Sequence, residues 1–163
     1  MKKNSRVAII IAFLIFLFCL DLFISRLPWA IIVIPPSFQK TEKFLNRGAP
    51  MWNNLPDWFL LIANAFYLAF LIFLGIRLLK ANARTRTILG IGLQVCGITA
   101  NFADRIFLRF VPDTLAVILY GRNLYFRPSD IYLVLGLILL FFDGEKVIKT
   151  LFYRSMGNEK RIG

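Results

Sequence analysis

Long apolar runs separated by short polar segments dominate the hydrophobic pattern of the chain. Crossing the roughly 30 Å hydrocarbon core of a bilayer takes about 20 helical residues, and four runs come near that length. The sequence therefore predicts an all-α membrane protein with four transmembrane helices. We expect these helices over residues 7–25, 56–76, 87–103 and 130–142.

Two longer segments separate the predicted helices and are expected to lie together on one side of the membrane. Residues 26–55 contain β-branched residues, a diproline break and a turn at Gly48, which indicates a small extended or β platform. Residues 104–129 mix aromatic residues with arginines, as expected for an interfacial loop. No internal repeat interrupts the pattern, so we expect residues 1–163 to form a single four-helix membrane domain.

Basic residues set the expected orientation. They flank the apolar runs in the N-terminal tail, in the short segment after the second run and in the C-terminal tail. Because short flanks rich in Lys and Arg are retained in the cytoplasm, both termini should be cytoplasmic and the two longer segments should face outward. A net charge of +11 could also suit nucleic acid. Positive flanks facing anionic lipids explain that charge, so we expect membrane lipids and no nucleic acid as partners.

Each predicted helix carries one polar residue at a similar depth in the outer half of the membrane: Asp21, Asn64, Asn101 and Asp130. A carboxylate in hydrocarbon costs several kcal/mol, so these groups should face the bundle interior or a wet cavity. Their common depth predicts one shared site. For Asn64 alone, a hydrogen bond that links two helices is an adequate explanation.

Asp104 and Arg105 are expected just beyond the third helix. A charge pair that anchors the helix end explains Asp104. Arg105 lies four residues after Asn101 and so shares its helical face. Its guanidinium could either join such a pair or hold a substrate carbonyl with its forked donors.

The available side chains restrict the chemistry. The chain has no histidine, which excludes Ser-His-Asp and Cys-His catalysis and His-ligated zinc, and it has no Gly-rich phosphate loop. Two carboxylates that share one proton can hydrolyse a peptide bond, one activating water while the other polarises the carbonyl. Asp113 and Asp130 are the candidates. Pro112 and Pro128 restrict the backbone beside each, although a proline there could also simply mark a helix end.

Five short motifs in this order resemble those of lipoprotein signal peptidase, the type II signal peptidase. They are Asp21 near the end of the first run, "NRGA" (46–49), "ANFADR" (100–105), "VPD" (111–113) and "FRPSD" (126–130). The resemblance implies an aspartic protease of the bacterial inner membrane that works near the outer leaflet. Such an enzyme removes the signal peptide from diacylglyceryl-modified prolipoproteins and uses no metal or cofactor. We expect it to act as a monomer.

The resemblance also implies roles for individual residues. Asp113 and Asp130 match the catalytic aspartates. Substrate contacts are implied for Asn101, Arg105, Asn46 and Gly48, and a supporting role for Asp21; we expect Asp104 and Arg127 to support the site as well.

Arg127 is the main departure from the family pattern, which has an asparagine at this position. An arginine beside the two acids could tune their ionisation, or it could mark a non-catalytic relative that binds lipid or lipopeptide. A third interpretation is an unrelated four-span assembly or transport protein, whose intramembrane acids link helices or relay protons.

Overall fold

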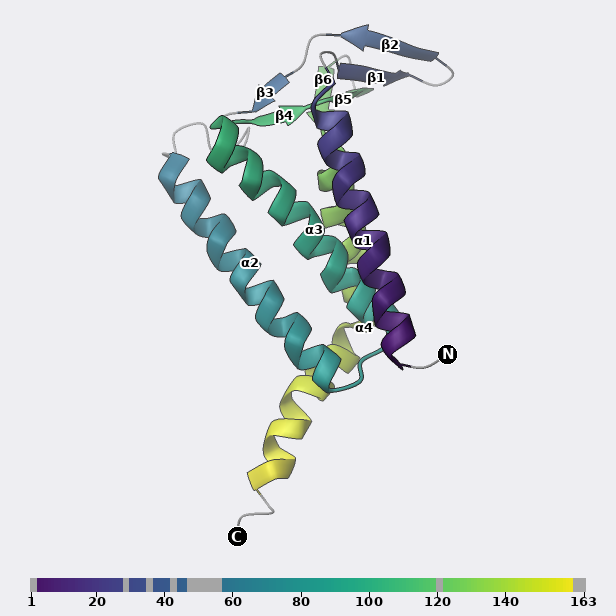
Figure 1. Ribbon diagram of the computed structural model, residues 1–163, viewed down its shortest axis with the longest axis vertical. Helices are drawn as coiled ribbons and strands as arrows, with labels where there is room; N and C mark the ends of the chain where they lie inside the picture. The colour runs from purple at the N-terminus through teal and green to yellow at the C-terminus, as the bar shows by residue number, and fades with distance from the viewer. Residues whose placement is uncertain are drawn as a thin grey trace.

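The computed structural model describes residues 3–27, 30–34, 37–41, 44–46, 57–119 and 122–159. Four helices run side by side within these residues, the strands gather at one end of them, and both termini lie toward the other end (Figure 1). The helices are α1 (Lys3–Ser25), α2 (Asp57–Lys80), α3 (Thr85–Leu108) and α4 (Pro128–Glu159). The expected helical bundle and the strand platform beside it are therefore both present.

The strands form two small sheets. One has the order β2-β1-β5-β6 and the other pairs β3 with β4. In the first sheet β1 runs parallel to β5, with Ile31 opposite Leu115, so the two segments expected outside the membrane are joined edge to edge. The strands are β1 (Ala30–Ile34), β2 (Ser37–Thr41), β3 (Phe44–Asn46), β4 (Val111–Asp113), β5 (Leu115–Leu119) and β6 (Arg122–Phe126).

The second outer segment is not the interfacial loop that the sequence predicted. It holds three strands, of which β5 and β6 form an antiparallel hairpin with Leu115 opposite Phe126. Aliphatic and aromatic residues fill these strands, and such residues favour the half-buried surface of a sheet. The arginines and aromatic residues that suggested an interfacial loop are equally compatible with this hairpin.

Two predicted helix ends are also corrected. Helix α3 continues through Leu108, so Asp104 and Arg105 belong to the helix and not to the outer segment. It stops at Arg109, whose left-handed backbone (φ 67°) forms the C-cap. Helix α4 starts at Pro128 and continues to Glu159, well past the expected end at residue 142. The apolar run ends at residue 142, but no proline follows it in the sequence to end the helix.

Helix α3 lies at the centre of the bundle and packs against the other three helices. Glycines allow it to approach α4 closely. A Cβ atom on Gly97 would lie 2.7 Å from the carbonyl oxygen of Ser129, and one on Gly136 would lie 2.7 Å from that of Gly90. Small residues at such contacts let membrane helices pack backbone to backbone. This contact fixes the start of α4 beside the last turns of α3.

The outer surfaces of α1 and α2 are apolar. Val7–Ser25 and Trp58–Lys80 are long and apolar enough to cross a membrane, judged by length and composition. Few of their side chains are buried inside the protein, and large residues such as Phe23, Phe66 and Phe73 point outward. Hydrocarbon is the environment that suits this surface. Helices α3 and α4 carry more of the polar residues.

Candidate active site

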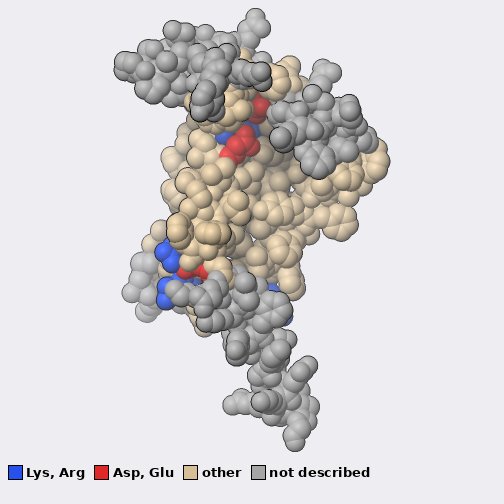
Figure 2. All heavy atoms as spheres, turned by 180° about the vertical axis from the view of Figure 1, so that it is seen from behind, with Lys and Arg blue, Asp and Glu red and all other residues tan. Residues whose placement is uncertain are grey.

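Helices α1 and α3 end, and helix α4 begins, at the strand end of the bundle (Figure 1). Asp21 lies near the end of α1, Asn101 and Asp104 lie in the last turns of α3, and Asp130 lies in the first turn of α4. Figure 2 shows acidic and basic side chains next to each other at the surface near this end. The fold thus brings together polar groups from three distant parts of the sequence.

Arg127 forms the centre of a buried ion cluster. Its Nε and Nη2 atoms donate to the two carboxylate oxygens of Asp21, and its Nη1 donates to Asp104 at 2.5 Å. The half-exposed Arg26 also donates to Asp104, at 3.3 Å. Both aspartates and Arg127 are at most 1 % exposed. Two cations thus balance two anions, which compensates the cost of burying them.

The electrostatics of the cluster keep Arg127 charged. Burial alone would lower the pKa of its guanidinium. The charges of Asp21 and Asp104, together with the hydrogen bonds these carboxylates accept, outweigh burial and raise that pKa above its usual value. The side chain of Arg127 is therefore a permanent cation that is committed to these two partners.

Asp130 is held by two hydrogen bonds from different elements. Its Oδ1 accepts from the Asn101 side-chain amide at 3.2 Å, and its Oδ2 accepts from the backbone N–H of Arg127 at 3.1 Å. Asn101 in turn accepts from the hydroxyl of Ser129 at 3.0 Å. Ser129 also donates its backbone N–H to Asp21 at 2.8 Å, which links Asp130 to the ion cluster. The carboxylate is thus fixed at the partly exposed edge of the cluster.

The local sequence explains why Asp130 takes this position. Pro128 is the first residue of α4, where a missing N–H is harmless and the fixed φ suits the helix. Asp130 reaches back to the backbone N–H of Arg127, in the manner of the third residue of a capping box. Proline therefore does mark a helix end here, as one of the two sequence interpretations proposed.

Asp113 lies at the open end of the β5–β6 hairpin. It ends β4 opposite Phe44 of β3, two residues before Leu115. Leu115 faces Phe126, and Asp130 follows Phe126 by four residues, so the hairpin returns the chain from one aspartate toward the other. Asp113 is 3 % exposed and, like Thr114 beside it, is buried.

The other predicted site residues lie on α2, α3 and β3 or outside the described residues. Arg105 is half-buried next to Asp104 on α3. Within the part of the chain that the structure describes, Asn64 of α2 makes none of the hydrogen bonds of this network, and the network joins residues of α1, α3 and α4. Asn46 ends β3 opposite Val111. Gly48 lies outside the described residues.

Arg26 and Ser129 are site residues that the sequence prediction omits. Arg26 gives Asp104 its second cation, and Ser129 connects Asn101 with Asp21. The sequence signal for each residue is its position: Arg26 directly follows the last residue of α1, and Ser129 directly precedes Asp130. Among the described residues, no three His, Cys, Asp or Glu side chains are grouped so as to hold a metal ion.

Comparison with known proteins gives this arrangement its context. Residues 7–144, which include every helix-borne member of the network, match the signal peptidase (SPase) II family. The chain belongs to this family. It is therefore a member of a peptidase family of bacterial membrane enzymes, and the interpretation as an unrelated assembly or transport protein is wrong.

Solved structures with the same fold are consistent with membership of the SPase II family. Two structures, each described as a bacterial membrane enzyme solved by the in meso method, at 2.3 Å and 1.9 Å resolution, superpose on the chain with TM-scores of 0.63. Each is 22 % identical in sequence. The matches cover 88 % and 85 % of this chain and 88 % and 91 % of those chains. The fold is thus shared over most of the length of each chain.

Proposed function

We propose that this SPase II member is an aspartic endopeptidase that removes the signal peptide from diacylglyceryl-modified prolipoproteins. Asp113 and Asp130 are its catalytic pair. The observation that carries the proposal is the placement of these two acids at the open end of one hairpin, with Asp130 held by Asn101 and by the start of α4. Positioned carboxylates are what a water-activating pair requires.

The reaction needs one proton shared between the two carboxyl groups. The ionised carboxylate takes a proton from a water molecule, whose oxygen attacks the scissile carbonyl carbon. The protonated carboxyl group donates its proton to the carbonyl oxygen. Collapse of the tetrahedral intermediate breaks the C–N bond, the leaving amine receives a proton from the pair, and a hydroxyl of the intermediate returns a proton to the pair. The two groups act and titrate as a unit, and no cofactor is required.

The distribution of charge supports an orientation for the enzyme. Arg77, Lys80, Arg84 and Arg86 lie at the end of the bundle opposite the strands, where the positive-inside rule places the cytoplasm. The chain would then be one domain that crosses the inner membrane four times, with both termini in the cytoplasm and the site near the outer leaflet. A lipidated cysteine in that leaflet could reach the site laterally.

Binding of the substrate peptide falls to the residues around the pair. Arg105 and Asn101 share one face of α3 beside Asp130 and could hold a carbonyl of the peptide. Asn46, from the adjoining strand β3, and Gly48 complete the proposed contacts. The enzyme would act as a monomer, because one chain supplies both acids.

The non-catalytic alternative depends on Arg127, and its contacts speak against that alternative. An arginine that neutralised the pair would direct its guanidinium at Asp130. Arg127 instead directs its guanidinium at Asp21 and Asp104 and offers Asp130 only a backbone N–H. This cation therefore supports the architecture around the pair and does not direct its guanidinium at Asp130.

Cleavage of a synthetic diacylglyceryl-modified precursor peptide by the enzyme in proteoliposomes tests the proposal. Asp113→Asn and Asp130→Asn should each abolish product formation. Asp143→Asn is the matched control, because this buried aspartate also lies on α4 but pairs with Arg86 and Thr87 at the opposite end. Persistent cleavage by either of the first two variants would disprove the assignment. A folded wild-type enzyme without activity would favour the lipid-binding relative.

A further inference from the structure

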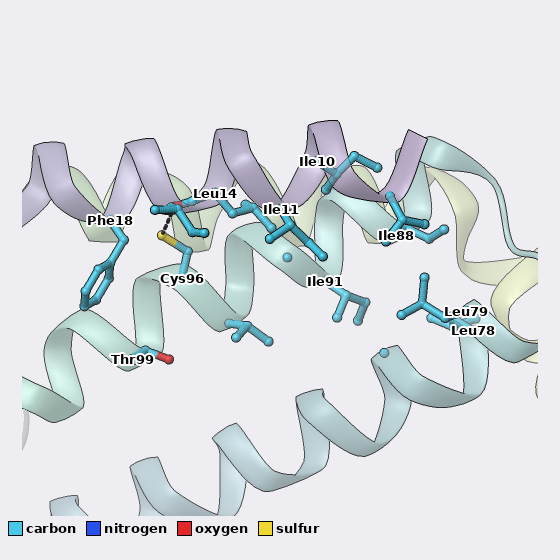
Figure 3. A pocket seen from close by; sticks show the side chains of 15 residues that line it. Ile10, Ile11, Leu14, Phe18, Leu78, Leu79, Ile88, Ile91, Cys96 and Thr99 are labelled. Atoms are coloured by element: carbon cyan, nitrogen blue, oxygen red, sulfur yellow. Dashed lines mark hydrogen bonds between the residues drawn. The ribbon is translucent and has the colours of Figure 1, made fainter. Parts of the chain in front are cut away.

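A second feature of the bundle lies away from the candidate active site. An apolar groove of about 360 Å³ runs between α1 and α2 and has α3 as its floor (Figure 3). Helices α1 and α2 both pack on α3 but have little direct contact with each other, which leaves the groove open along one side. Lining residues include Ile10, Leu14 and Phe18 of α1, Leu79 of α2, and Ile91 and Val95 of α3.

The chemistry of the groove selects its occupant. Its walls are almost entirely hydrocarbon, with Thr99 and Cys96 as the polar exceptions, so a polar ligand would lose its hydrogen bonds there. A flexible acyl chain has the apolar surface that suits these walls.

The groove occupies only one half of the bundle. Along α1 it extends from Val7 to Phe18, and along α3 from Ile88 to Thr99. Each stretch measures about 16 Å at 1.5 Å per residue. That length matches one leaflet, which is half of the roughly 30 Å hydrocarbon core. The groove ends about one turn short of Asp21, so a chain inside it would not reach the candidate active site.

Positive charge lies at the entrance of the groove. Leu79 and Ile88 line it at the end where α2 turns into α3. Lys80 and Arg84 are exposed on either side of that turn. Basic side chains at a membrane surface attract anionic headgroups by about 1 kcal/mol each. A lipid whose tail lay in the groove would hold its phosphate close to these two residues.

We propose that the groove is a binding site for one acyl chain of an anionic phospholipid from the leaflet on the strand-free side, with Lys80 and Arg84 at its headgroup. This site is separate from the peptidase site and does not depend on the proposed reaction. The bound lipid would fill the space between α1 and α2 and join two helices that scarcely touch.

Photolabelling tests the site directly. The full-length protein is placed in nanodiscs that contain phosphatidylglycerol with a diazirine at the end of one acyl chain, and labelled peptides are mapped by mass spectrometry. Label should concentrate on the groove residues of α1, α2 and α3. It should be several-fold weaker on outward residues such as Phe66 and Phe141, which are exposed on other faces.

Paired variants separate the acyl-chain site from the headgroup site. Gly92→Leu should reduce groove labelling several-fold, because even a Cβ there collides with Leu14 of the groove wall. Gly144→Leu is the control, since a Cβ at Gly144 meets nothing within 4 Å. Lys80→Gln combined with Arg84→Gln should reduce the preference for phosphatidylglycerol over phosphatidylcholine roughly 30-fold. Arg109→Gln, at the strand end, should leave it unchanged.

Three results would overturn the proposal. One is uniform labelling of the groove and of the outward faces. Another is equal labelling by phosphatidylglycerol and phosphatidylcholine in the wild-type protein. The third is displacement of the phospholipid label by a diacylglyceryl-modified precursor peptide, which would assign the groove to the substrate. Loss of peptidase activity would have no bearing on any of these readouts.

Discussion

Arg127 holds Asp21 in a two-point ion pair, with Nε and Nη2 each donating to one carboxylate oxygen. Both side chains are completely buried, and 106 residues separate them in the sequence. The pair therefore ties the end of α1 to the start of α4. A forked guanidinium is the one cationic group that can serve Asp21 and Asp104 together.

Replacing Arg127 by Gln should destabilise the protein severely. The change leaves Asp21 buried without a cation and Asp104 with only Arg26, and breaking a buried pair from one side costs about 3–5 kcal/mol. The stability of Arg127→Lys should lie between that of the wild type and that of Arg127→Gln, because an ammonium group keeps the charge but cannot reproduce the two-point contact of the guanidinium. Thermal unfolding in detergent measures both variants.

Arg26→Gln provides the comparison for this experiment. Half of the Arg26 side chain is exposed, so its ion pair with Asp104 is screened by solvent and its loss should cost at most about 1 kcal/mol. Equal unfolding temperatures for the Arg127 and Arg26 variants would contradict a central role for Arg127.

Asp130→Asn should lose activity while it keeps its stability. Asparagine retains an oxygen that can accept from the backbone of Arg127, so we expect a stability loss below about 1 kcal/mol. Cleavage should nevertheless fall by about 10³-fold or more, since one acid of the pair is gone. If Asp130→Asn unfolded readily and its activity fell in proportion to the fraction unfolded, the role of Asp130 would be to stabilise the start of α4 and not to catalyse cleavage.

Asn101→Ala should lower the rate of cleavage by roughly tenfold, because one hydrogen bond of about 1.4 kcal/mol no longer orients Asp130. Ser129→Ala should have a smaller effect in the same direction, since its hydroxyl acts only through Asn101. Steady-state cleavage of the lipidated peptide gives both values. A larger effect of Ser129→Ala than of Asn101→Ala would contradict the inference that Ser129 acts on Asp130 through Asn101.

Gly97→Leu should loosen the contact between α3 and α4. Even the first side-chain carbon would meet a carbonyl oxygen of the neighbouring helix, and that backbone cannot yield as a flexible side chain can. Overpacking of this kind costs about 1–3 kcal/mol. Gly144→Leu is again the matched control, and detergent-solubilised protein of each variant can be compared by its unfolding temperature.

Sequence reasoning predicts the parts of this protein that depend on local pattern. The apolar runs give the cores of α1 and α2, and the β-branched run gives β1. Helix α3 passes its predicted end because nothing before Arg109 interrupts it, and hydropathy falls at Asp104 before the helix does. A fall in hydropathy marks a change of environment and is a poor guide to the end of a helix.

The contacts of the site could not be predicted in the same way. Arg127 stands beside Asp130 in the sequence, yet its side chain bonds to Asp21 and Asp104. Pairing over such a separation is set by the fold, because several aspartates offer similar local chemistry. The order of the motifs predicts that Asp113 and Asp130 lie in one region. Their relative position depends on the register of β5 with β6, which the sequence does not reveal.

The parallel pairing of β1 with β5 has a consequence for the biogenesis of the enzyme. Ile31 leaves the ribosome long before its partner Leu115, and parallel strands cannot pair through a simple hairpin. One edge of β1 must therefore remain unpaired until α3 and β5 have been synthesised. The enzyme would become active only at the end of its assembly. A truncated chain could therefore be bound to the membrane and still be unable to cleave its substrates.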